Sequence, residues 1–464
     1  LSDGYRYNAS TNSRSFFFSG GYFGKKNTLK FTGFYGKSEN GLAYGPVAIS
    51  DIENDPRTNY VSENDVDNFG QWMAQLQHIL AINDHTTLVS TAYYGGAGGN
   101  FPFGFDDGSG TFTQINYPLY NDHVGLMSVI KTRLADEKLH ISGGVHGYRF
   151  LRQNLEQIVP DYSNPYYDDE SIKDEFSGFA TLSYKWKGFN FYGDVQVRYV
   201  QLELYPDNEF LGLQVKRFRH DWLFINPKGG INYTVNDHVQ AYASFGRTGR
   251  EPTRFDLLGS TQINLSNYPL VAGDNAVQPE FVNDLELGVK LNWPSVRVNV
   301  NFFHMQFENE IAPIGEFIPQ GFVQVYKNQE PSNRKGIEID YAWEFLSIMR
   351  LRGHLTYMQS NIESYTPSGS NVTYTDVTPI LSPEWNVQTT LEANIAKRVS
   401  LGVTGRYLSE AYLELTNDPT LTIPSSFVAD LNLSYRFYKE HSISIQLNNL
   451  LDQRYYTYGA PVFT

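Results

Sequence analysis

Two short runs of aromatic residues stand beside acidic residues in segments of little strand character. The first run is Phe101, Phe103 and Phe105, which precede two aspartates. The second is Tyr166 and Tyr167, which precede three acidic residues. Aromatic rings in such loops could stack on a planar ligand. Loop packing and solvated acidic loop tips explain the same residue types, and we favour that interpretation while keeping all five as ligand candidates.

Three arginines form a further candidate group. Arg247, Arg250 and Arg254 lie where a segment of alternating apolar residues runs into a long polar segment. A guanidinium group binds anions in a fixed, planar geometry, so these residues could attract an anionic ligand. They complete the set of candidate ligand contacts.

Patterns typical of metal sites are absent from the sequence. None of the ten His residues takes part in an H-E-x-x-H motif, and the chain has no Cys to supply a thiolate. Asp65 with Asp67, or Asp106 with Asp107, could bind calcium, but the spacing is not that of an EF-hand and a solvated acidic loop is favoured. A single haem ligand is left open among His78, His123, His146 and His220. We therefore predict no metal site and no cofactor.

The composition argues against nucleic-acid binding and against a helical membrane protein. The chain has 464 residues and a formal net charge of -14, whereas a nucleic-acid binder needs a basic face. Its 33 Tyr, 31 Phe and 39 Gly accompany a mean hydropathy of -0.40, so the apolar surface is spread thinly. No run of 18 apolar residues exists, which excludes a membrane-spanning helix. A protein that crosses the membrane with β-strands is still compatible with this composition, because the alternation of apolar and polar residues lowers the mean hydropathy of such strands.

Alternation of apolar and polar residues is the dominant pattern of the chain. It is clearest in three windows, residues 285–292, 296–303 and 442–448. In the second window Val296, Val298 and Val300 would share one face of a strand, because successive side chains point to opposite faces. Each window therefore predicts a strand with one apolar and one polar face.

Short polar turns and long polar segments follow one another regularly. We expect the turns at nine places, namely residues 25–27, 83–85, 135–137, 185–188, 236–238, 292–294, 346–347, 396–398 and 438–440. Segments rich in Gly, Pro, Asn and Asp lie between them, such as 39–69, 98–121, 153–175, 247–281 and 361–384. Neighbouring turns are about 40 to 60 residues apart, which fits two tilted membrane-spanning strands and one long loop. The pattern predicts an all-β, transmembrane antiparallel β-barrel with about 18 strands in this chain.

The tryptophans and the direction of the first and last strands refine this prediction. Trp residues lie beside short turns or where a long loop enters a strand, which predicts two interfacial belts made of Trp72, Trp186, Trp222, Trp293, Trp343 and Trp385. The first expected strand, 13–23, runs toward a short turn, and the last, 442–450, runs away from one. Both termini of a complete barrel are periplasmic, so we expect strands to be missing at both ends.

Several short motifs occur in order along residues 20–458. The most specific is Asn448-Asn449-Leu450-Leu451-Asp452 with Tyr455 and Tyr456. The others lie at residues 21–26, 34–37, 242–253, 278–288, 333–338 and 423–437. Together they resemble the TonB-dependent outer-membrane receptors, particularly the iron-siderophore type, whose C-terminal signature is N-L-F-D-x-x-Y. The chain departs from the family pattern at Leu451 and Gly249, where Phe is usual.

This resemblance implies a 22-stranded barrel filled by an N-terminal plug. Residues 1–464 would then form a single barrel domain that supplies strands 4 to 21. The plug, the first strands and the closing strand would have no counterpart in this chain. A fragment, a truncated gene or a partner chain would each explain this, and we favour an incomplete gene or a fragment.

The resemblance also implies active transport across the bacterial outer membrane. Extracellular loops would bind a scarce, bulky nutrient, and the TonB complex would supply energy through the plug. A ferric siderophore is the expected ligand, with cobalamin, haem, a peptide or a glycan as alternatives. The expected partners are outer-membrane lipid, the TonB complex and this small molecule, and not nucleic acid. Because the three arginines fall in a general family segment, we favour a structural role for them.

Two other classes of function stay open as alternatives. A passive outer-membrane channel would share the barrel but not the plug. An outer-membrane lipase or protease would need a catalytic Ser-His-Asp set, and no G-x-S-x-G motif is present. We therefore predict that the protein is not an enzyme. A soluble β-sandwich or lectin is disfavoured, because lipid-facing alternation runs through so many strands.

Overall fold

The computed structural model describes residues 2–43, 47–106, 112–159, 167–205, 218–258, 277–318, 323–367 and 370–459. Within these ranges, 21 strands form one sheet, and two smaller sheets have two strands each. The strand registers are antiparallel throughout the pairs that they cover. The predicted all-β antiparallel architecture is therefore confirmed.

Nine hairpins with short turns carry the long strands in the described part of the chain. In order they are β1 (Thr11–Phe23) with β2 (Asn27–Gly41), β3 (Val66–Ala81) with β4 (Thr86–Asn100), β7 (Leu119–Leu134) with β8 (Leu139–Ile158), β9 (Tyr167–Trp186) with β10 (Phe189–Tyr205), β11 (Phe218–Asn236) with β12 (Val239–Arg250), β13 (Glu280–Trp293) with β14 (Val296–Glu308), β17 (Ser332–Phe345) with β18 (Met349–Tyr365), β20 (Trp385–Ala396) with β21 (Val399–Leu408), and β24 (Ser426–Tyr438) with β25 (His441–Leu447). Each turn falls at one of the nine places expected from the sequence, so the predicted set of long strands is confirmed.

The long connections contain short elements that the sequence did not predict. These are α1 (Ile49–Asn54), β5 (Pro102–Asp106), β6 (Phe112–Asn116), α3 (Arg254–Leu258), β15 (Ile311–Ile318), β16 (Val323–Asn328), β19 (Tyr374–Val377), β22 (Ala411–Tyr412) and β23 (Thr422–Ile423). Among the described residues, no helix is long and apolar enough to cross a membrane.

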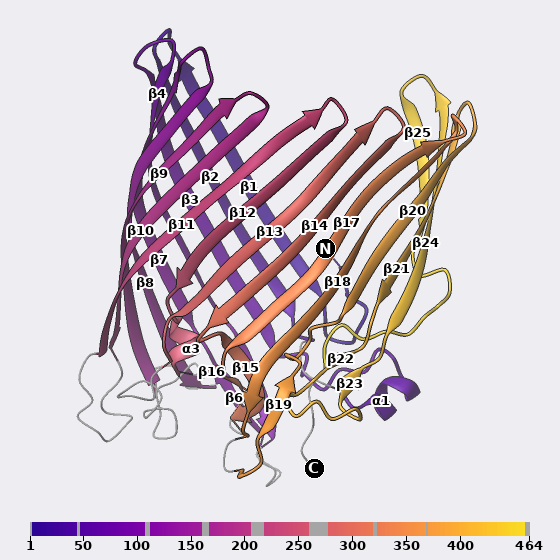
Figure 1. Cartoon of the computed structure of the whole chain (residues 1–464). Helices are drawn as coiled ribbons and strands as arrows, with labels where there is room; N and C mark the ends of the chain where they lie inside the picture. The colour runs from indigo at the N-terminus through magenta and orange to yellow at the C-terminus, as the bar shows by residue number, and fades with distance from the viewer. Residues whose placement is uncertain are drawn as a thin grey trace. The chain divides into compact units, whose positions relative to one another are not determined.

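Contacts divide the chain into two compact units. Unit 1 comprises residues 1–182, 195–225 and 253–276, and unit 2 comprises residues 183–194, 226–252 and 277–464. Strands β9, β10 and β11 contribute residues to both. In unit 2, Figure 1 shows β15, β16, β19, β22 and β23 at the end of the long strands that lies opposite the short turns. We call the two ends of the strands the short-turn end and the long-connection end.

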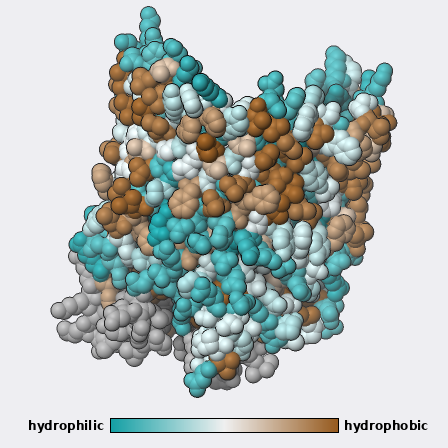
Figure 2. Space-filling view, viewed as in Figure 1, coloured by the Kyte–Doolittle hydropathy of each residue, from teal (hydrophilic) through white to brown (hydrophobic). Residues whose placement is uncertain are grey.

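Strands β13 and β14 each have one apolar and one polar face. Leu287 pairs with Phe302 and Val289 pairs with Val300, and all four belong to the exposed or half-exposed apolar face. The polar face is formed by Glu286 and Lys290 of β13 with Asn299 and Asn301 of β14. Figure 2 shows hydrophobic surface on the half of β13, β14, β17 and β18 nearer the short turns, and hydrophilic surface toward the long connections. This band matches the lipid-facing alternation expected from the sequence.

The backbone conformation of the short turns follows from their residue types. Lys187 and Gly188 both have positive φ, 43° and 85°, as a two-residue turn of type I′ requires. Asn236 closes another turn through its side chain, whose Oδ1 accepts hydrogen bonds from the backbone N–H groups of His238 and Val239 at 2.9 and 3.0 Å. Polar residues therefore define the hairpin register locally.

The tryptophans support the expected belt at one end of the strands. Trp186, Trp293 and Trp343 lie beside short turns and are exposed. Trp222 does not fit the second belt, and its prediction as an interfacial residue is wrong. It shares a strand face with Phe224, which is 1% exposed, whereas Leu223 on the other face is 63% exposed. Successive side chains of a strand point to opposite faces of the sheet. The position of Trp222 beside a long loop does not indicate which of the two faces it occupies.

Candidate functional site

An aromatic group lies at the long-connection end of unit 1. The ring centroids of Phe101 and Phe103 are 6.2 Å apart with nearly parallel planes, and those of Phe101 and Tyr117 are 5.4 Å apart. The three side chains come from the segment that carries the β5–β6 hairpin, which is more ordered than the loop expected from the sequence. Phe101 and Phe103, predicted separately as ligand contacts, are thus brought together.

Asp65 fixes the position of this hairpin. Its side chain is buried, and Oδ1 accepts hydrogen bonds from the backbone N–H of Gly104 at 3.0 Å and from Gln114 Nε2 at 2.7 Å. Its Oδ2 accepts a hydrogen bond from the backbone N–H of Ser62 at 3.2 Å. Both oxygens are therefore used in anchoring the polypeptide, which gives this carboxylate a structural role in place of the calcium site considered for Asp65 and Asp67.

Tyr117 adds a neutral hydrogen-bonding group to the aromatic group. Burial, followed by the nearby Glu156 carboxylate, raises the pKa of its phenol above the ordinary value. The phenol therefore stays protonated at neutral pH.

The remaining aromatic candidates cannot be placed in this group. Tyr166 lies outside the described residues, and the described part of the structure does not include the side chains of Phe105 and Tyr167. All three stay predictions from the sequence.

The three candidate arginines do not form one cluster. Arg247 and Arg250 are three residues apart on β12 and therefore point to opposite faces of the sheet. Arg247 donates hydrogen bonds from both Nη atoms to the Glu308 carboxylate, at 2.9 and 2.8 Å. Arg250 donates from Nε to Glu280 at 2.9 Å and from Nη2 to the carbonyl oxygen of Ile311 at 3.2 Å. Each guanidinium links strands or connections that are distant in sequence.

Arg254 makes the most buried of the three ion pairs. It lies in α3 and donates from Nε to Asp169 Oδ2 at 2.9 Å, and Nη2 contacts the same oxygen. The side chains of Arg254 and Asp169 are 9% and 1% exposed. Asn154 donates a further hydrogen bond to Asp169 Oδ1 at 2.9 Å. A carboxylate held by a guanidinium and an amide inside the protein fastens α3 to the start of β9.

A cavity of about 510 Å³ lies in unit 1 on the polar face of the strands. Its wall combines amides, such as Gln75 and Asn121, with the aromatic and imidazole side chains of Tyr93, His123 and His146. The phenol oxygen of Tyr93 lies 3.3 Å from His123 Nε2 and 2.9 Å from His146 Nε2. The sequence presents these histidines as single candidates and does not predict that they lie together. Their convergence depends on the register of β4, β7 and β8.

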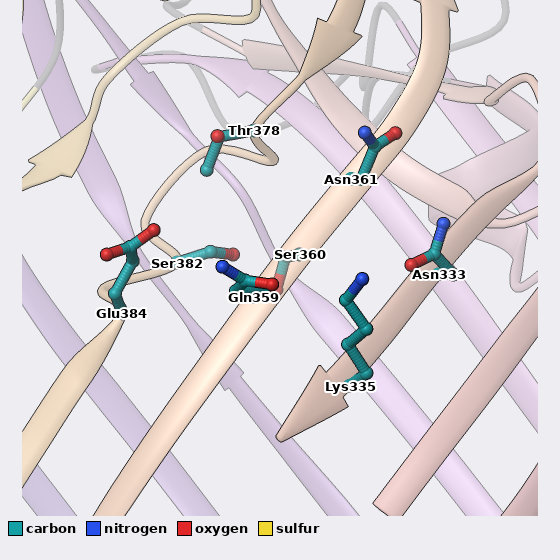
Figure 3. A pocket seen from close by; sticks show the side chains of 8 residues that line it. All are labelled: Asn333, Lys335, Gln359, Ser360, Asn361, Thr378, Ser382 and Glu384. Carbon is teal, nitrogen blue, oxygen red and sulfur yellow. The ribbon is translucent and has the colours of Figure 1, made fainter.

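A second, fully polar pocket of about 280 Å³ lies in unit 2 (Figure 3). Its side chains come from β17, β18 and the connection to β20, and they are Asn333, Lys335, Gln359, Ser360, Asn361, Thr378, Ser382 and Glu384. Asn333 and Lys335 are on the same strand face as Ile337 and Ile339, but nearer the long-connection end. On this face the side chains are therefore apolar within the hydrophobic band and hydrogen-bonding nearer the long-connection end.

Among the described residues, no group of three or more His, Cys, Asp or Glu side chains is arranged to hold a metal ion. The aromatic group and the two pockets supply aromatic surface, amides and charged side chains, which are groups that small-molecule sites commonly use.

The fold and the sequence place the chain in a known family. The family model described as "TonB dependent receptor-like, beta-barrel" matches residues 4–450, and the chain belongs to this family. The members of this family are transport receptors of the bacterial outer membrane and not enzymes. The match confirms the resemblance seen in the sequence and the expected localisation in the outer membrane.

Solved structures of similar fold include several ferric-siderophore receptors. The ferric-catecholate import receptor Fiu from E. coli K12 in its closed form has a TM-score of 0.75 and 16% identity, over 98% of this chain and 72% of that one. The unliganded ferric citrate transporter FecA has a TM-score of 0.78 and 12% identity, over 97% and 67%. The siderophore receptor PiuA from Acinetobacter baumannii has a TM-score of 0.74 and 13% identity, over 97% and 72%. No curated protein matches the sequence.

Proposed function

We propose that this chain forms the barrel of an outer-membrane receptor that imports a ferric siderophore with energy from the TonB complex. The observation that carries the proposal is the family match over residues 4–450. The fold shared with several receptors named for ferric complexes supports the choice of ligand class. In this proposal residues 1–464 act as one barrel domain, the TonB complex acts through a plug outside these residues, and the chain catalyses no reaction.

The aromatic group at the long-connection end is the proposed first contact for the ligand. Phe101 and Phe103 present two stacked rings in a hairpin held by a buried carboxylate, so their position does not depend on the ligand. Planar groups of a siderophore, such as a catechol ring, could stack there. We propose a structural role for Arg247, Arg250 and Arg254, because a carboxylate engages each guanidinium.

A binding panel on the detergent-solubilised full chain tests the ligand class. Ferric catecholate, ferric citrate, cobalamin, haem and an oligosaccharide are titrated while the tryptophan fluorescence is recorded. We expect saturable binding of a ferric siderophore. Binding of only cobalamin, haem or the oligosaccharide would overturn the choice of ligand, and ion conductance in planar bilayers without any binding would indicate a passive channel.

Two variants test the proposed contact. Phe101→Ala removes one ring of the stacked pair and should weaken ferric-siderophore binding about 2- to 10-fold, the value of one aromatic contact. Phe345→Ala is the matched control, because Phe345 lies beside a short turn and packs on Trp343 at 4.8 Å. Equal affinities of the two variants would remove Phe101 from the site. Uptake of labelled iron by cells with and without TonB tests the transport step.

A further inference from the structure

Three side chains on the polar face of unit 1 point their donor atoms at one place. Tyr93 comes from β4, His123 from β7 and His146 from β8. The two Nε2 atoms lie 3.3 and 2.9 Å from the single phenol oxygen. In a hydrogen-bonded state, the phenol can donate its proton to only one imidazole and must accept a proton from the other. The three groups therefore share two protons around one point.

These separations are close to those between ligands of a bound metal ion. Metal–nitrogen bonds of 2.0–2.1 Å at tetrahedral angles place neighbouring donor atoms about 3.3–3.4 Å apart. The Tyr93–His123 separation already has this value, and the Tyr93–His146 separation is a few tenths of an ångström shorter. Small rotations of the side chains would thus replace the two shared protons by one cation.

The surrounding packing holds the three rings in position. A Cβ atom at Gly125 would lie 2.3 Å from the Tyr93 ring, so the absence of a side chain at this residue makes room for the phenol. The ring of Tyr148 is 5.0 Å from that of His123 and 5.4 Å from that of His146, between centroids. Preorganised ligands lose little conformational entropy when a metal ion binds.

The cavity beside the three side chains gives an ion a way in. Tyr93, His123 and His146 all line the 510 Å³ cavity and are half-buried. Water in this cavity could complete the coordination, as in metal sites with an open position. Because these residues are on the polar face, lipid does not cover them.

We propose that Tyr93, His123 and His146 bind one first-row transition-metal ion through the phenolate oxygen and the two Nε2 atoms. Binding releases the phenol proton to solvent, and a histidine that carries its proton on Nε2 changes to the tautomer with the proton on Nδ1, so that both imidazoles stay neutral. Imidazole nitrogens suit copper, zinc and iron, and copper(II) binds most tightly among the divalent ions of this series. The proposal departs from the sequence prediction of no metal site, and it does not depend on the ligand that the receptor transports.

Titration of the purified, metal-free chain with copper(II) in detergent, without siderophore, tests this site. We expect one equivalent to bind, with nitrogen hyperfine structure in the electron paramagnetic resonance spectrum and a phenolate-to-copper absorption band. His123→Ala and His146→Ala should each weaken binding at least tenfold. Tyr93→Phe should abolish the absorption band and keep the nitrogen hyperfine structure.

His140→Ala is the matched control, because His140 lies near a short turn, where its Nε2 is 2.9 Å from the carbonyl oxygen of Glu137. Its copper affinity should equal that of the wild-type chain. If the alanine variants do not fold, His123→Gln and His146→Gln remove the imidazole and keep a hydrogen-bonding group next to Tyr93. Unchanged copper affinity and spectra in these variants, or an equal loss in His140→Ala, would overturn the proposal.

Discussion

The two ends of the strands in unit 1 carry ion pairs of the same chemistry in opposite surroundings. At the short-turn end, Arg133 and Glu137 lie 3.1 Å apart with side chains 50% and 65% exposed. At the long-connection end, the side chains of Arg254 and Asp169 are 9% and 1% exposed. Water screens the first pair, whereas removal of either partner of the second leaves a charge inside the protein. The difference shows that interactions between distant segments stabilise the long-connection end, and local turn geometry specifies the short-turn end.

The largest effect is expected at the buried pair. Arg254→Met should lower the free energy of unfolding by about 3–5 kcal/mol, because the buried Asp169 carboxylate would lose the guanidinium that offsets its desolvation. Urea unfolding in lipid vesicles measures this. Arg133→Met is the control at the other end and should change the free energy by less than about 0.5 kcal/mol. The double variant Arg254→Met with Asp169→Leu should recover most of the loss, and equal losses at the two ends would contradict the comparison.

The apolar band between the ends should give the next effect. Leu287→Arg places a charge on the lipid-facing side of β13 and should cost about 2–4 kcal/mol. Glu286→Arg, one residue away, stays on the polar face and should cost much less. Thermal unfolding of both variants in the same vesicles checks the assignment of the two faces. Equal destabilisation would mean that the faces are wrongly assigned.

The smallest effect concerns turn geometry at the short-turn end. Gly188→Ala should cost about 1–2 kcal/mol, because φ is 85° there and a residue with a Cβ atom is strained in that region. Lys187→Ala is the control, since Lys187 already bears a side chain at positive φ. Both are compared by urea unfolding. A negligible effect of Gly188→Ala would show that this turn does not define the register of its hairpin.

The sequence predicts the hairpins well and the site poorly, for physical reasons. Alternation and polar turns are local patterns, so the hairpin of β13 and β14 could be inferred from residues that are adjacent in the chain. The pairing of Arg254 with Asp169 joins residues 85 positions apart, and no local pattern reports it. The β7–β8 turn could have placed His123 and His146 on one strand face. Tyr93 reaches them only through the pairing of β4 with β7 across a long connection.

The unequal lengths of the connections also affect how the protein can change. Closing a flexible loop costs only about 0.6 kcal/mol more for each doubling of its length. Insertions in the long connections, away from anchoring residues such as Asp65, would therefore disturb the sheet little, whereas an extra residue in the turn at Lys187–Gly188 would shift a register. New binding specificities can thus evolve by exchange of long connections on an unchanged scaffold, and the same segments are the natural sites for engineered epitope insertions.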